Sequence, residues 1–344
     1  MSHHPTPLKF LMPGWFAIVM GLCGLALAWQ RAVPLMGEMA GAGALILGVV
    51  AALVAAVLAV ASLVRWQRYR QALADDLKHP VRHAFVAAMP ISLILLATVV
   101  TALAGPTLPG TVLWVAGSAW QFGVTVWVLA RWLRPTAGGS AASSPFWASI
   151  TPALFIPVVG NVLPPLAGVT LGFPEWSAAQ FGVGLLLWPV VLALLAVRIG
   201  VHGLWAERVL PATFITIAPP AVIGLAALQL GAPTLLAWGA WGVALFFVAW
   251  SASLFKRAIS QPFAVTFWAM AFPLAAFSAL TLRLAPGTSG GFQALAMLTL
   301  ALCSLVVAAL SLATVKGLRD GTLLAPEPVA MLNPVGAVPG TGAP

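Results

Sequence analysis

The sequence contains very little charge. Only 7% of its 344 residues are Asp, Glu, Lys or Arg, whereas 61% are hydrophobic, and the mean hydropathy is +1.03. Soluble domains carry about 25% charged residues, so this composition excludes an ordinary soluble protein. A transmembrane helix needs about 20 apolar residues, and the chain has room for ten such spans with short connections. The sequence therefore predicts an all-α integral membrane protein.

The residue clusters that catalysis and metal binding require are also absent. Cys23 and Cys303 lie in apolar stretches, which argues against a disulfide framework, and the histidines lie at the N-terminus or in predicted loops. The sequence has no His and Cys cluster at ligand spacing, no P-loop and no Gly-x-Ser-x-Gly turn. We therefore expect no enzymatic activity, no metal and no cofactor.

Charge is also missing from the interior of every predicted span. Proton-coupled transporters use carboxylates or histidines inside the membrane as relays, and many cation channels select with acidic rings. Both classes are disfavoured. A path without fixed acid and with bases at one mouth admits anions more readily than cations, although those bases could serve only to set the topology.

Basic residues are distributed unequally between the two sides of the predicted membrane. Ten apolar runs predict spans near 11–30, 41–64, 84–104, 111–130, 148–171, 176–197, 212–232, 234–255, 262–282 and 291–315. One side carries 14 of the 16 basic residues, and the other has only Arg31 and Arg283. Since short basic loops stay in the cytoplasm, both termini are predicted there. Topology thus explains the net charge of +9 without nucleic-acid binding.

The chain divides into two predicted parts. Residues 1–316 are predicted to form the ten-helix transmembrane pore domain. Residues 317–344, rich in Gly, Pro and Ala, are predicted to be a disordered cytoplasmic tail, because they cannot bury enough apolar surface to fold alone.

Proline is concentrated in the odd-numbered spans. Proline in a membrane helix frees a carbonyl that protein or cavity water must satisfy, so we expect the odd spans to be inner helices. Five bent inner helices ringed by five straighter ones would form five helical hairpins around a central pore. The alternative is that the prolines merely kink packed helices. The candidate pore-lining or kinked prolines are Pro13, Pro90, Pro157, Pro219 and Pro273.

Four phenylalanines occur in or near these proline segments: Phe16, Phe155, Phe214 and Phe272. A bulky ring aimed at a pore axis can block it by excluding water, although a phenylalanine in a membrane helix more often packs in the core or faces lipid. Asn161 is the amide in the middle of an odd span. It is either a packing amide that bonds to backbone freed by nearby prolines, or a pore ligand.

Four stretches together resemble the tellurite-resistance and dicarboxylate transporter family, which includes the bacterial protein TehA and the plant slow-type anion channels. They are PGWFAIVMGLCGLALAW at 13–29, FIPVVGNVLPPLAGVTLG at 155–172, TFITIAPPAVIGL at 213–225 and FWAMAFPLAAFSALTLRL at 267–284. The resemblance implies five hairpins around a pseudo-fivefold axis and a homotrimer with one pore per subunit. It also implies that Phe272, next to Pro273, is the phenylalanine that closes the pore.

This resemblance leads to one main hypothesis and two alternatives. The main hypothesis is an anion channel or uniporter of the bacterial inner membrane that conducts small anions passively. A carrier or efflux protein for C4-dicarboxylates, sulfite or tellurite-type oxyanions is the competing transport activity. A membrane sensor that conducts nothing is the alternative from another class. Family members often have Tyr-Phe where this chain has Trp15-Phe16, which leaves Phe16 as a possible pore-facing ring.

Overall fold

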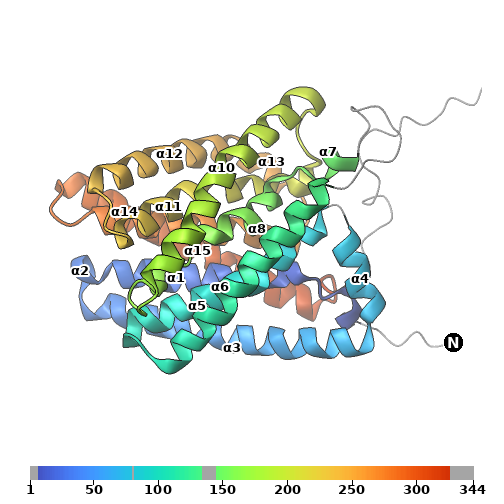
Figure 1. The fold of residues 1–344 in the computed structure, drawn as a ribbon, viewed down its shortest axis with the longest axis horizontal. Coiled ribbons are helices and arrows are strands. Elements are labelled where there is room, and N and C mark those ends of the chain that lie inside the picture. The colour runs from blue at the N-terminus through green and yellow to red at the C-terminus, as the bar shows by residue number, and fades with distance from the viewer. Residues whose placement is uncertain (1–6, 80, 134–144, 326–344) are drawn as a thin grey trace, which may run out of the picture.

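A computed structural model describes residues 7–79, 81–133 and 145–325 of the chain, and these residues form helices and no strand (Figure 1). Within them, nine helices are long and apolar enough to cross a membrane. The predicted all-α membrane fold is therefore confirmed.

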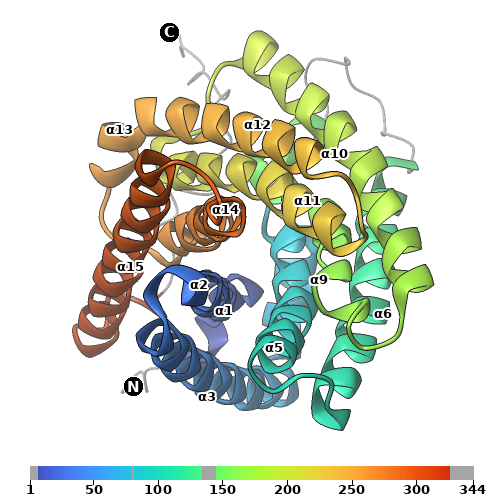
Figure 2. The same cartoon turned by 90° about the vertical axis from the view of Figure 1, so that its left-hand side faces the viewer.

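The long helices alternate between two positions. Among the nine long helices, those of the odd-numbered spans have 67 to 83% of their apolar 18-residue window buried, and those of the even-numbered spans have 17 to 39%. Figure 2 shows the same sorting, with α1, α5, α9, α11 and α14 inside and the long outer helices around them. The prediction that the proline-rich odd spans are inner helices is thus confirmed. The outer helices are α3 (Glu38–Arg68), α6 (Leu108–Leu129), α10 (Pro174–His202), α12 (Thr234–Ser253) and α15 (Gly290–Arg319).

Four inner spans change from a 3-10 helix to an α-helix near the middle of the molecule. The pairs are η2 (Pro13–Phe16) with α1 (Ala17–Arg31), η3 (Arg82–Ala87) with α5 (Ala88–Ala104), η8 (Glu207–Ile217) with α11 (Ala218–Gln229), and η9 (Val265–Met270) with α14 (Ala271–Leu284). Pro90, Pro219 and Pro273 each lie in the first turn of an α-helical half. Proline is tolerated there because the first-turn N–H groups have no partner within the α-helix.

The fifth predicted span, near 148–171, is the most irregular. Instead of one helix it contains α7 (Pro145–Ser149), η6 (Pro152–Leu154), α8 (Phe155–Val159), η7 (Gly160–Val162) and α9 (Pro165–Gly168). Its four prolines remove hydrogen-bond donors and stop each helix from continuing. The apolar part, Pro152–Gly168, is shorter than the nine long helices. The count of ten spans and the pseudo-fivefold symmetry stay predictions.

The other predicted boundaries differ from the observed helices by a few residues, and several outer helices extend further than predicted. The last helix, for example, continues to Arg319 rather than ending near residue 315. Leu323 then folds back against Gly317, so the first residues of the predicted tail are ordered. The rest of that prediction, residues 326–344, lies outside the described residues.

Short helices mark the two ends of the bundle (Figure 1). We call the end with α2 (Val33–Met36) the α2 end and the end with α4 (Arg70–Lys78) the α4 end. Each inner span runs from the α4 end to the α2 end, and each outer helix runs back (Figures 1 and 2).

Candidate pore and gate

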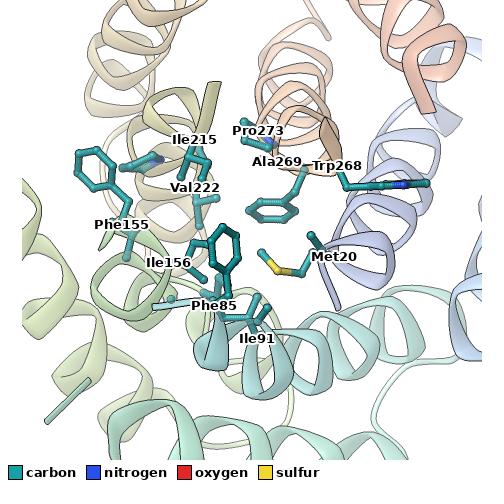
Figure 3. A pocket seen from close by; sticks show the side chains of 18 residues that line it. Met20, Phe85, Ile91, Phe155, Ile156, Ile215, Val222, Trp268, Ala269 and Pro273 are labelled. Carbon is teal, nitrogen blue, oxygen red and sulfur yellow. The ribbon is translucent and has the colours of Figure 1, made fainter. Parts of the chain in front are cut away.

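A cavity of about 50 Å³ lies among the inner segments, and each of the five odd segments contributes to its wall (Figure 3). Its centre is where the α-helical halves begin, because Ala17, Ala88 and Ala218 are the first residues of α1, α5 and α11. The small alanine side chains leave this space unfilled. The larger residues in the wall are Met20, Phe85, Ile91, Phe155, Ile156, Val159, Leu163, Ile215, Pro219, Val222, Trp268, Phe272 and Pro273.

The wall of this cavity is apolar. Trp268 has the only side-chain polar atom in it, and its Nε1–H donates to Thr314 Oγ1 on α15 at 2.8 Å. A volume of 50 Å³ could hold a few waters, but a buried water needs two to four polar partners. The cavity is therefore a narrow apolar space among the inner helices that offers a water few partners, and we call it the constriction.

Phe272 forms part of this wall from the first turn of α14, and the residue is 9% exposed. The ring packs on α1 where that helix has Gly24: a β-carbon built there would lie 3.0 Å from Phe272 Cδ2. Pro273 follows at the cavity wall (Figure 3). The predicted gate residue is thus at the constriction, held between a glycine of α1 and the cavity.

The other predicted residues separate into two groups. Phe155, Pro219 and Pro273 join Phe272 at the cavity. The remaining prolines and Phe214 are not in its wall, and Phe214 instead makes an edge contact with Phe255 of α13 (Phe255–Ile259). Those outside the wall are Pro13, Phe16, Pro90, Pro157, Asn161 and Phe214.

Phe16 lines a second cavity, of about 470 Å³, on the side of the molecule. Its wall includes Trp66 of α3 and Trp120 of α6, both more than 40% exposed. Phe16 therefore lines a space between inner and outer helices and not the axial cavity.

Asn161 is fully buried and bonds away from the axial cavity. Its Nδ2 donates to the carbonyls of Val158 and Pro157, at 3.0 and 3.2 Å, and its Oδ1 accepts from Gln180 Nε2 at 3.0 Å. Gln121 Nε2 on α6 also donates to the Pro157 carbonyl, at 2.8 Å. Asn161 therefore bonds to carbonyls in the last turn of α8 and does not line the axial cavity.

The sequence analysis missed Gln121 and Gln180, which fix the broken segment from the outer helices α6 and α10. Both side chains are buried, and Ser118 Oγ on α6 donates to Gln180 Oε1 at 2.6 Å. A polar amide such as Gln121 in an otherwise apolar span was the available signal. The fifth span has four prolines, and carbonyls left without a helical partner need donors inside the membrane.

Charged residues lie at the ends of the bundle. At the α4 end, Asp76 is 2% exposed and accepts from Arg65 Nη2 at 2.7 Å and Arg82 Nη1 at 3.2 Å. Arg65 Nε also donates to the Lys9 carbonyl, and Arg131 donates to the Leu77 carbonyl. Three spans therefore hold α4 in place. No group of metal ligands occurs within the described residues.

These features define a class: a multi-pass membrane protein whose inner helices surround an apolar, constricted axial cavity. The sequence profile of the SLAC1 family, described as voltage-dependent anion channel, matches residues 11–315. The chain belongs to this family, and it is a membrane protein of anion transport rather than an ordinary soluble protein.

Curated relatives agree with this assignment. An uncharacterized transporter of Methanocaldococcus jannaschii is 23% identical over 79% of this chain and 83% of its own length. The tellurite resistance protein TehA homolog of Haemophilus influenzae is 24% identical over 80% of each chain. The S-type anion channel SLAH2 of Arabidopsis thaliana is 25% identical over 64% of this chain and 41% of its own length.

Proposed function

We propose that this protein is a passive pore for small anions and that Phe272 closes it. The observation that carries the proposal is the apolar cavity among the inner helices, with Phe272 in its wall. An ion in a narrow apolar constriction loses its hydration without compensation, so such a constriction is a barrier to conduction. Removing the ring lowers this barrier.

The sign of the permeant ion follows from the charges around the path. The wall has no carboxylate, and the basic residues cluster at the α4 end. The α-helical halves of inner spans begin at the cavity, where helix N-termini carry partial positive charge. The preceding 3-10 turns reduce this effect, since Ala17 N–H already bonds to the Gly14 carbonyl. Both contributions favour an anion over a cation.

The proposal includes an orientation and an assembly. Because short basic loops remain in the cytoplasm, the α4 end and both termini face the cytoplasm of a bacterial inner membrane. The protein assembles as a homotrimer with one path in each subunit, as the family resemblance implies. The permeant ions are small inorganic or organic anions.

The test compares Phe272→Ala with Phe277→Ala in proteoliposomes. Phe277 is a matched control, because it is on the same helix but stacks on Trp241 of α12 and does not line the cavity. We expect F272A to raise chloride and nitrate flux at least about tenfold, a barrier change of about 1.4 kcal/mol, and F277A to leave it at the wild-type level. A folded F272A protein without this rise would overturn the gate.

The competing activity is a carrier for dicarboxylates, sulfite or tellurite-type oxyanions. The same proteoliposomes distinguish it when chloride, nitrate, malate and sulfite are tested in parallel. A pore gives no counterflow, even where a binding site makes its flux saturate at high concentration. Saturation together with accelerated exchange against internal anion would establish a carrier instead.

A further inference from the structure

We propose that Arg31 and Arg283 form an anion-binding site at the α2 end of the path, which captures a small oxyanion or carboxylate above Phe272. The proposal rests on the anion path described above and adds a site and a ligand class to it. It starts from the fact that, among residues 7–79, 81–133 and 145–325, these two arginines are the only Lys or Arg residues at the α2 end.

Both arginines lie on the cavity-facing sides of their helices. Arg31 follows Met20 by 11 residues on α1, and Arg283 follows Phe272 by the same 11 residues on α14. Eleven residues of α-helix make about three full turns and rise about 17 Å. Each arginine therefore lies directly above a residue of the cavity wall, toward the α2 end.

The two helices also bring the arginines to the same level. α1 and α14 are neighbours inside the bundle (Figure 2). A β-carbon at Gly21 would lie 2.7 Å from that of Ala271, and one at Gly24 would lie 3.0 Å from that of Ala275. The two helices therefore run parallel and pack very closely, because α1 has glycine at both contacts. Continued along both helices, this register brings Arg31 and Arg283 to about the same level.

Neither arginine makes an ion pair within the described part of the chain, whereas Arg65, Arg82 and Arg257 do. The carboxylates of the α2 end are Glu38 and Glu175, in the first turns of the outer helices α3 and α10. An acid stabilises a helix N-terminus, which accounts for both. Charge at this end is thus sorted radially, with positive groups on inner helices and negative groups on outer ones.

A helix C-terminus also favours a cation, and this explains one arginine on each helix. It does not explain why the two arginines stand at one level on adjacent inner helices, where like charges repel. A bound anion removes that repulsion. The planar fork of guanidinium matches paired oxygens, so the site favours nitrate, sulfite or a carboxylate over chloride.

The test uses planar bilayers with the conducting F272A protein as background. The variants are Arg31→Gln, Arg283→Gln and Arg31→Lys, with Arg257→Gln as the control. Arg257 is exposed at the α4 end and pairs with Glu207 at 3.6 Å. Nitrate is added from the α2 side or from the α4 side, and the half-saturating concentration is measured.

We expect R31Q and R283Q to raise the half-saturating nitrate concentration about tenfold, only when nitrate is added at the α2 side. R31K retains the positive charge but loses the planar guanidinium, so it should weaken the binding of nitrate more than the binding of chloride. R257Q should match the background. An unchanged half-saturating concentration in both glutamine variants overturns the site while the pore stands. A silent F272A protein overturns the gate instead.

A second measurement does not depend on conduction. In neutral detergent, nitrate should raise the melting temperature of the wild-type protein but not that of the R31Q/R283Q double variant. The same comparison in phosphatidylcholine and phosphatidylglycerol nanodiscs separates a free anion from a lipid phosphate. Stabilisation by phosphatidylglycerol alone, with none by nitrate, would assign the arginines to lipid and overturn the proposal.

Discussion

Gly24 of α1 faces the ring of Phe272 on α14, and a β-carbon at Gly24 would lie 3.0 Å from Phe272 Cδ2 and 3.0 Å from Ala275 Cβ. Real β-carbons rarely have neighbours this close, so the ring position depends on the absence of a side chain at residue 24. The contact joins the first and ninth spans at the constriction.

Replacing Gly24 with Val should therefore destabilise the protein through Phe272. Overpacking a close contact costs about 1–3 kcal/mol, which should lower the melting temperature in detergent. The variant F272A removes the ring and should recover part of this loss in the double variant G24V/F272A.

The control for this pair is Gly239→Val, because a β-carbon at Gly239 on α12 meets no atom within 4 Å. G239V should change the melting temperature by the same amount in the wild-type and F272A backgrounds. Additive effects of G24V and F272A on the melting temperature would show that the ring and the glycine are not coupled.

Gln180 should be important for the stability of the broken fifth segment. The change Gln180→Leu leaves Asn161 Oδ1 without its donor and removes the acceptor of Ser118 Oγ. We expect a loss of about 1–2 kcal/mol, measured by thermal unfolding in detergent. Gln229→Leu, which affects only an exposed bond to Thr170, should cost much less; equal losses would argue against a structural role for the buried amide.

Asp76 is buried and its neighbour Asp75 is exposed, so replacing each in turn tests whether the buried carboxylate holds α4 in place. Asp76→Asn weakens the ion pairs to Arg65 and Arg82 and leaves Arg65, 5% exposed, without a counter-charge. Breaking a buried ion pair costs about 3 kcal/mol, so α4 should detach and become sensitive to trypsin.

Asp75→Asn is the control, since Asp75 is exposed and bonds only to Gln71. Surface substitutions of this kind change the free energy of unfolding by no more than about 0.5 kcal/mol. If D75N and D76N were cleaved at the same rate, the buried cluster would not be what holds α4.

The proposed orientation predicts that a green fluorescent protein fused after Pro344 is fluorescent in bacteria, because it folds in the cytoplasm. A reporter inserted after Gly287, between α14 and α15 at the α2 end, should behave as an external one. Alkaline phosphatase activity at Gly287 and not at Pro344 is the expected pattern, and the reverse pattern would invert the topology.

Much of the fold was predictable because its signals are local. Membrane spans follow from the length of apolar runs, and the inner position of the odd spans follows from prolines such as Pro90 and Pro219, whose freed carbonyls require partners. The sequence could not predict that Pro152–Gly168 is divided into short helices, because the donors that permit this, Gln121 and Gln180, come from distant spans.

The candidate site was predictable only in part. Four phenylalanines had the same local context, yet Phe272 and Phe155 line the cavity, whereas Phe16 and Phe214 do not. The difference depends on how each helix is rotated about its axis, and that rotation is set by contacts such as Gly24 with Phe272.

The sequence by itself determined that this is a membrane protein, where its helices lie and which of them are inside, since hydropathy and proline act within one segment. The tertiary structure decided which side chains meet at the axis, which amides satisfy the broken segment and that Arg31 and Arg283 share one level above the cavity. These relationships join residues far apart in the chain, and only the close packing of α1 against α14 and its neighbours brings them together.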